Sequence, residues 1–115
     1  MSVVPSDWLE RLPFAVTVCD REGIIIEMND RAVEVFSKYG GRALIGRSLL
    51  DCHTETSRGK LLRLLREGQS NIYTIEKEGG KKIIIQSPWR SSSEYAGLVE
   101  ISIELPDHLP HFIRE

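Results

Sequence analysis

Two segments near the end of the sequence, residues 81–89 and 95–105, constrain the fold more than any other part of the chain. Isoleucine or valine recurs at every second position in both segments, and the link 90–94 between them is polar and short, as a hairpin connection should be. The alternating apolar residues are Ile83, Ile85, Val99, Ile101 and Ile103. A period of two gives each strand one mainly apolar face. Because a two-stranded ribbon is not stable alone, we expect other strands or helices to cover that face.

Three further strands are predicted upstream of this hairpin. Residues 14–19 and 24–28 are rich in β-branched and apolar residues, and the turn 20–23 between them ends in glycine, which predicts a first hairpin. Residues 71–77 also alternate, and the turn 78–80 joins them to the long hairpin. The sequence therefore predicts five strands, with the intervening region left for helices.

Two helices are predicted between the second and third strands. The first is capped by residue 29 or 30 and is stopped by the glycine pair 40–41, whereas the second is capped by residue 56 or 57 and continues to about residue 66. The segment 42–53 has no clear period and is interpreted as short helical turns and loop. The residues expected to face the core are Ala32, Val35, Phe36 and Tyr39 in the first helix and Leu61, Leu64 and Leu65 in the second.

Length and charge exclude several classes of protein. At 115 residues the chain fits one domain, and its net charge of −2 is spread along the sequence, so nothing indicates a nucleic-acid partner. There is no apolar run long enough to cross a bilayer and no signal-peptide pattern at the start, so we expect no membrane contact and a cytoplasmic location. In that setting Cys19 and Cys52 are expected to be free thiols.

Four short motifs occur in an order that is typical of one family. Residues 29–32 (Asn-Asp-Arg-Ala) look like the Asn-x-x-Ala that leads from its second strand into a helix, and residues 45–48 (Ile-Gly-Arg-Ser) look like its apolar-Gly-basic-Ser segment. Residues 49–53 look like the stretch that precedes its long helix, with Thr54 where a proline is common, and residues 95–97 look like the entry to its last strand. The chain resembles the PAS sensor domain family.

This resemblance implies an α+β fold, a five-stranded antiparallel sheet with helices packed on one face. It covers about residues 12–105 of a single domain that spans 1–115. It implies a sensor or protein-interaction module in signalling, such as regulation of transcription, rather than an enzyme, with a pocket for a small ligand between the sheet and the helices. The candidate pocket residues are Val16, Val18, Ile26, Phe36, Leu61, Tyr73, Ile85, Val99 and Ile101. The alternative is that these residues simply fill a packed core.

Cofactor chemistry depends on Cys52 and His53. Haem-binding members of the family carry a histidine on the long helix, and His53 precedes the expected helix by about a turn, so it is a candidate haem ligand or a structural, capping residue. Photoreactive flavin-binding members have Cys followed by Arg-Phe-Leu, whereas Cys52 is followed by His-Thr-Glu. The resemblance therefore assigns no cofactor, and a haem-dependent redox or gas sensor stays as the least favoured hypothesis.

Metal binding and catalysis have little support in the sequence. His108 and His111 have a plausible ligand spacing with Cys52 and His53, but Pro110 disfavours the helix that would place both rings on one face, so a polar tail is the simpler interpretation. No nucleophile elbow, phosphate-binding glycine loop or zinc-protease motif is present. We therefore expect no metal site and no enzymatic activity.

A dimer is the main alternative to a ligand sensor. Residues 7–12 are predicted to form a short helix, and its apolar residues Trp8, Leu9 and Leu12 can either contribute to a homodimer with the outer face of the sheet or cap their own core. After the last strand, Pro106 and Pro110 oppose a continuous signalling helix. The sequence identifies neither the ligand nor the output partner.

Overall fold

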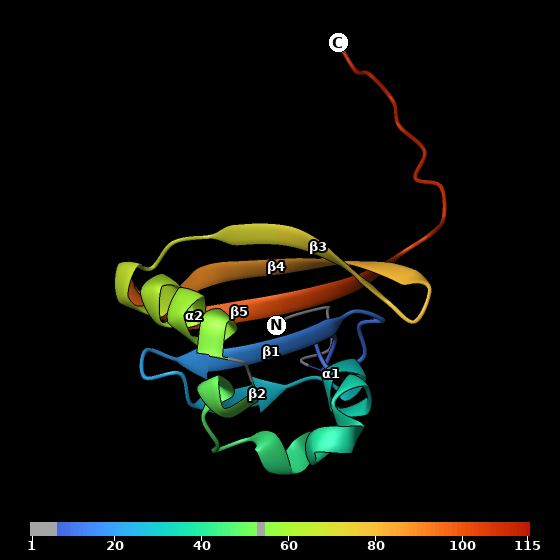
Figure 1. Ribbon diagram of the computed structural model, residues 1–115. Helices are drawn as coiled ribbons and strands as arrows, with labels where there is room; N and C mark the ends of the chain where they lie inside the picture. The colour runs from blue at the N-terminus through green and yellow to red at the C-terminus, as the bar shows by residue number, and fades with distance from the viewer. Residues whose placement is uncertain (1–6, 53–54) are drawn as a thin grey trace.

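One five-stranded antiparallel sheet, in the order β2-β1-β5-β4-β3, organises the protein (Figure 1). The computed structural model describes residues 7–52 and 55–115. The strands are β1 (Ala15–Asp20), β2 (Ile25–Met28), β3 (Asn71–Lys77), β4 (Gly80–Ser91) and β5 (Glu94–Leu105). The long hairpin β4–β5 forms the middle of the sheet and continues beyond its predicted ends, so that only Ser92 and Ser93 connect its strands. The predicted fold class is confirmed.

In the described part of the connection from β2 to β3, the chain forms two α-helices and three short 3₁₀ segments. The helices are α1 (Asp30–Val35) and α2 (Glu55–Glu67), and the 3₁₀ segments are η1 (Ser37–Tyr39), η2 (Gly41–Leu44) and η3 (Leu49–Cys52). The first helix is shorter than predicted, because the regular hydrogen-bonding pattern changes at Phe36 and the chain continues as η1. Tyr39 is consequently 60% exposed rather than part of the core.

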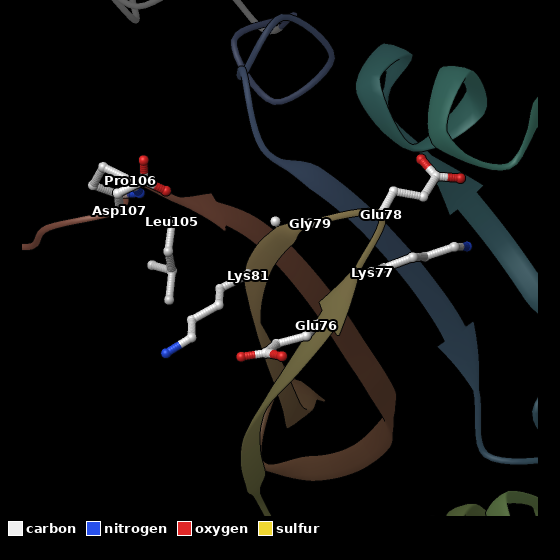
Figure 2. Close-up of a pocket in the computed structure, with 9 residues that line it drawn as sticks. Glu76, Lys77, Glu78, Gly79, Lys81, Leu105, Pro106 and Asp107 are labelled. Atoms are coloured by element: carbon white, nitrogen blue, oxygen red, sulfur yellow. The ribbon is translucent and has the colours of Figure 1, made fainter.

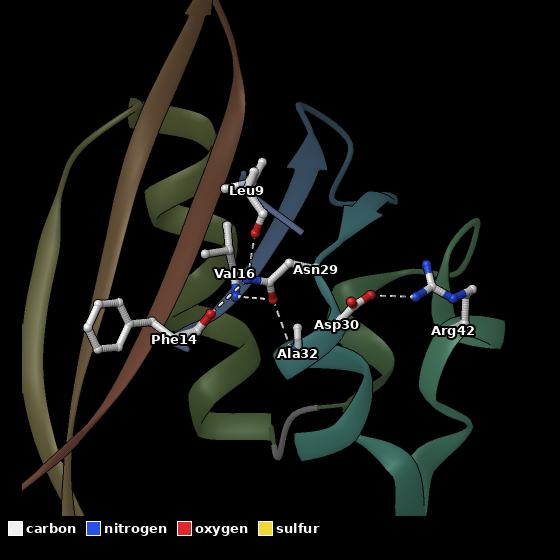
Figure 3. A network of polar contacts seen from close by, with 7 residues as sticks. All are labelled: Leu9, Phe14, Val16, Asn29, Asp30, Ala32 and Arg42. Atoms are coloured by element: carbon white, nitrogen blue, oxygen red, sulfur yellow. Dashed lines mark hydrogen bonds and ion pairs between the residues drawn. The ribbon is translucent and has the colours of Figure 1, made fainter. Parts of the chain in front are cut away.

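Asn29 fixes the start of α1 against the sheet (Figure 3). Its side-chain oxygen accepts hydrogen bonds from the backbone nitrogens of Ala32, in the helix, and Val16, in β1. Its side-chain nitrogen donates to the backbone oxygens of Leu9 and Phe14. The Asn-x-x-Ala motif is therefore a helix cap that also joins α1, β1 and the N-terminal segment.

The register determines which side chains face the helices. In β1 and β5, Cys19 pairs with Leu98, and both belong to the buried cluster that also contains the buried leucines of α2. We call this side of the sheet the inner face. Pairing partners in antiparallel strands lie on the same face and neighbours along a strand alternate, so Val18 and Val99, which also pair, lie on the opposite, outer face.

This register corrects five of the predicted pocket residues. They all lie on the outer face, away from the helices: Val16, Val18, Ile85, Val99 and Ile101. Ile101 pairs with Val16 in β1 and with Ile85 in β4. They do not line the space between the sheet and the helices. The period of two identified correctly which residues share a face, but it does not indicate which face the helices cover.

The N-terminal segment is a turn rather than the predicted helix. Two hydrogen bonds of 3.3 and 3.4 Å, from Arg11 to Trp8 and from Leu12 to Leu9, form this turn. Trp8 is 54% exposed, while Leu9 and Leu12 are half-buried. Within the described residues, neither helix is long and apolar enough to cross a membrane.

Candidate functional site

A small cleft lies between α2 and the inner face of β3 and β4. We call it the α2 cleft, and its volume is about 200 Å³. Its lining residues are Ser57, Lys60, Leu61 and Leu64 from α2, Asn71 and Tyr73 from β3, and Gln86 from β4. Leu61 and Leu64 are buried, so the cleft combines an apolar wall from the helix with a polar floor from the sheet.

The floor of the cleft is a chain of side-chain hydrogen bonds across three strands. Asn71, Gln86 and Glu100 lie side by side, because Asn71 pairs with Gln86 and Gln86 pairs with Glu100. The Asn71 side-chain nitrogen donates to Gln86 Oε1 at 3.0 Å, and Gln86 Nε2 donates to Glu100 Oε2 at 3.0 Å. Gln86 is only 5% exposed. Burial of an amide at this position is tolerated because both of its polar ends have partners.

Tyr73 and Lys60 line the cleft opposite one another, on β3 and α2. The Lys60 ammonium lies 5.7 Å from the centre of the Tyr73 ring, within the range of a cation–π interaction. Burial, and secondarily the negative charge of Glu100, raise the pKa of Tyr73. Its phenol therefore stays protonated at neutral pH and keeps a hydrogen-bond donor at the cleft.

A second contact ties the far end of α2 to the sheet. The hydroxyl of Tyr95, at the start of β5, donates to the backbone oxygen of Leu65 at 2.7 Å. The ring also packs over Gly68, just after the helix, and the guanidinium of Arg21 lies 5.6 Å from its centre. The helix wall of the cleft is thereby connected to the central strand β5.

Wider hollows elsewhere are less suited to hold a ligand. One of about 640 Å³ lies between α1 and the β3–β4 turn, and none of its lining side chains is buried. Another of about 300 Å³ lies at the same turn (Figure 2). In Figure 2 Lys77 and Glu78 extend away from Glu76 and Lys81, so their charges do not converge on one point. A hollow of about 330 Å³ beside α1 and β5 has one small buried side chain in its wall, Ala15. The α2 cleft has three, Leu61, Leu64 and Gln86.

The predicted pocket residues are distributed over several places. Leu61 and Tyr73 line the α2 cleft. Phe36 packs against the core without lining the cleft, and Ile26 is 45% exposed. The pattern of apolar positions does not predict the polar lining residues Ser57, Lys60, Asn71 and Gln86. A sequence signal for such residues does exist: a polar residue at an inward-facing position of an otherwise apolar strand, such as Gln86 in β4.

The cysteine and histidine candidates do not assemble into a site in the part of the chain that is described. His53 lies outside the described residues, so the structure does not test the hypothesis that it binds haem. No group of three or more His, Cys, Asp or Glu residues suited to a metal ion occurs among residues 7–52 and 55–115. His108 and His111 are in the exposed C-terminal segment. Cys19 is a buried free thiol, and burial raises its pKa.

The sequence of the chain matches the family described as PAS fold over residues 9–70. The chain therefore belongs to the PAS family. No curated protein matches it.

Solved PAS domains have the same fold. The PAS domain of the histidine kinase ThkA is 21% identical over 78% of this chain and 97% of that one, with a TM-score of 0.63. The PAS domain of BvgS from Bordetella pertussis is 17% identical over 85% and 81% of the two chains, with a TM-score of 0.63. The Aer2 receptor from Vibrio cholerae, described as a dual PAS-heme oxygen sensor, is 15% identical over 81% and 95%, with a TM-score of 0.62. At these identities the similarity shows the fold alone.

Proposed function

We propose that this protein is a signalling module that senses a small ligand bound in the α2 cleft. Domains of this family are typically sensory or regulatory units of histidine kinases and receptors. The observation that carries the proposal is the hydrogen-bonded floor of the cleft, which runs from Asn71 through the buried Gln86 to Glu100 beneath a helix wall. A site with a few convergent polar groups and an apolar wall is the usual form of a small-molecule site.

The response to the ligand would pass through α2. A ligand that contacts both Lys60 and Asn71 joins the helix to the sheet and favours the arrangement in which the two are close. Such a ligand can shift the population of helix positions only as far as it binds one position more tightly than another. Since Tyr95 ties α2 to β5, the shift also reaches the strand that leads into the C-terminal segment. The proposed output is regulatory, such as control of transcription through a protein partner.

Native mass spectrometry of the protein purified from its host tests this function, with an absorbance spectrum of the same sample. We expect an additional mass that denaturation releases. Asn71→Leu should remove it, because the substitution takes away the polar end of the cleft floor. Thr74→Leu is the matched control, because Thr74 lies on the outer face of the same strand, opposite Ile83. A clean apo mass, or an additional mass that Asn71→Leu retains, would contradict the proposal. A Soret band that His53→Ala abolishes would assign a haem instead.

The outer face favours a second function, homodimerisation. Its apolar residues come from four adjacent strands: Val16, Val18, Ile72, Ile83, Ile85, Val99, Ile101 and Ile103. Val16 is already buried within the chain, so the other seven would form the contact surface. The buried side chains of α1 and α2 cluster with the inner face, and Ile72 remains 62% exposed. An apolar sheet face suits a second copy of the same chain, since a two-fold interface is self-complementary. Trp8, which is also exposed, and its neighbours Leu9 and Leu12 would extend this interface.

Sedimentation velocity over a range of concentrations tests this second function. We expect a dimer that Ile101→Lys dissociates, because the charge would be placed in the middle of the outer face. Ile101→Thr, which keeps a β-branched side chain, should weaken the dimer without loss of the fold. Glu27→Lys reverses an existing charge on the same face at the edge strand, opposite Val18, and serves as the control that should leave the dimer intact. A protein that stays monomeric at high concentration would exclude the dimer.

A further inference from the structure

The orientation of the amides in the cleft floor is fixed by Glu100. A carboxylate can only accept hydrogen bonds, so the nitrogen of Gln86 must face Glu100 and its oxygen must face Asn71. The nitrogen of Asn71 then donates to Gln86, as observed, and the side-chain oxygen of Asn71 is left at the end of the chain. The floor therefore offers a hydrogen-bond acceptor at β3, where it meets the cleft.

The wall of the cleft carries positive charge. Lys60 is the charged residue among the lining residues, and it makes no ion pair in the part of the chain that the structure describes. Its ammonium instead lies over the Tyr73 ring. The helix as a whole has four basic and two acidic residues, all of them exposed, although the net charge of the protein is −2. An anion is therefore attracted to this side of the molecule against its overall charge.

We infer that the ligand of the α2 cleft is a small organic acid that also carries a hydrogen-bond donor. Its carboxylate pairs with Lys60, and its apolar part packs on Leu61 and Leu64. Its hydroxyl or amide donates to the side-chain oxygen of Asn71, which accepts no hydrogen bond from the described residues. The protonated phenol of Tyr73 is a further donor for the carboxylate. This inference rests on the proposed sensor function and adds the chemical class of the ligand.

Paired acids and amides test the class of ligand. The probes are mandelate and lactate, each of which has a carboxylate and a hydroxyl, and their neutral counterparts mandelamide and lactamide. The readout is the side-chain amide ¹H–¹⁵N signals of Asn71 and Gln86 during titration. We expect the acids to shift these signals and to bind about five- to tenfold more tightly than the amides, which corresponds to about 1 to 1.4 kcal/mol. Mandelate should bind more tightly than lactate, because its ring reaches the leucines.

Two variants assign the effect to one residue. Lys60→Gln should reduce the affinity for mandelate to that for mandelamide and leave the affinity for mandelamide unchanged. Arg63→Gln removes the same charge from the same helix at an exposed position that does not line the cleft, so it should have little effect. Both positions are on the surface of α2, and we expect both variants to fold.

The possible failures are distinguishable. If the amides bind as tightly as the acids, or if Lys60→Gln behaves like Arg63→Gln, the assigned class of ligand is wrong while a ligand-binding cleft stands. If neither acid moves the Asn71 and Gln86 signals up to about 10 mM, beyond the range of weak specific binding, the assigned class is also wrong. The additional mass in the native spectrum then decides independently whether the cleft holds a ligand of another class.

Discussion

The side-chain oxygen of Asn29 accepts a hydrogen bond of 2.9 Å from the backbone nitrogen of Val16, thirteen residues earlier in the chain. The same amide group makes three further hydrogen bonds, so that both of its N–H groups and both of its acceptor positions are used (Figure 3). Asn29 is 2% exposed. A single side chain thus satisfies four backbone groups where α1, β1 and the N-terminal segment meet.

Asn29→Asp is expected to destabilise the protein by about 2 to 4 kcal/mol at neutral pH. The carboxylate can still accept from Val16 and Ala32, but it can no longer donate to the oxygens of Leu9 and Phe14 and repels them instead. At a pH low enough to protonate the new carboxyl group, it donates to one of these oxygens, so the difference from the unsubstituted protein should become smaller. Urea unfolding at several pH values measures this.

Asp30→Asn is the control for that substitution. Asp30 is adjacent, carries a similar side chain and is exposed, with only a 3.3 Å surface ion pair to Arg42. Its substitution should change the free energy of unfolding by about 0.5 kcal/mol or less. Equal effects at the two positions would show that the four hydrogen bonds of Asn29 contribute no special stability.

Gly97→Ala and Gly59→Ala are expected to have opposite effects. Gly97 lies in β5 with φ of +153°, and a Cβ atom there would lie 2.0 Å from the backbone oxygen of Cys19 in β1. Alanine would force the two central strands apart and should cost about 3 kcal/mol or more, as overpacking with backbone shifts does. Gly59 lies in α2 with open space around it, so alanine there should stabilise the helix by about 0.5 to 1 kcal/mol. Thermal unfolding of both variants checks the two signs, and a stable Gly97→Ala would contradict the close approach.

The strands could be predicted from sequence because their signals are local. Residues 71–77 were predicted as a strand and form β3 with the same bounds, and the hairpin β4–β5 was displaced by only one or two residues at its ends. Alternation identifies a strand and glycine-containing turns separate strands, without reference to the rest of the molecule. Tyr39 shows the limit of such signals, since its helical spacing is correct but α1 ends four residues earlier.

The site could not be predicted from the same signals. Apolar residues such as Val99 and Ile101 were assigned to the interior because burial favours them, but the helices cover the other face, which carries Gln86 and Glu100. These polar groups are accommodated there because they bond to each other across strands, and the register that allows this is a long-range property. Sequence alone indicated the class of fold but not the polarity of its cleft.

Cys19 is expected to react with thiol reagents only when the protein opens. Its side chain is 1% exposed, and burial raises the pKa of the thiol, so little of the reactive thiolate is present at neutral pH. In a Cys52→Ser variant, in which Cys19 is the only cysteine, the rate of labelling should rise with urea in parallel with unfolding. Complete labelling within seconds in native buffer would contradict the burial.

The same thiol should also make stability depend on pH in the alkaline range. Because the pKa is higher in the folded than in the unfolded state, the unfolded state loses its proton first as the pH rises. The contribution of the neutral thiol is therefore complete below the unfolded pKa, about 8.5, and is lost as the pH rises from there through the folded pKa. In the Cys52→Ser background, the variant Cys19→Ala should lose less stability between neutral and alkaline pH than the protein that retains Cys19. The urea midpoints of both proteins, measured at several fixed pH values, test this. An identical pH dependence with and without Cys19 would exclude this contribution.

Tyr95→Phe is expected to loosen α2 more than the sheet. The hydroxyl of Tyr95 donates to the backbone oxygen of Leu65, and that hydrogen bond holds the last turns of the helix to β5. Its loss should cost about 1 kcal/mol, which corresponds to about fivefold faster hydrogen exchange of α2 amides that exchange by local opening. Tyr39→Phe removes the same hydroxyl from a ring that is 60% exposed, and it should leave these rates unchanged. Exchange measured by NMR distinguishes the outcomes, because a general loss of stability would accelerate the slowest amides of β1 and β5 as well. If exchange accelerates only in α2, the helix can move relative to the sheet while the sheet stays intact. A ligand that acts at the α2 cleft requires such movement.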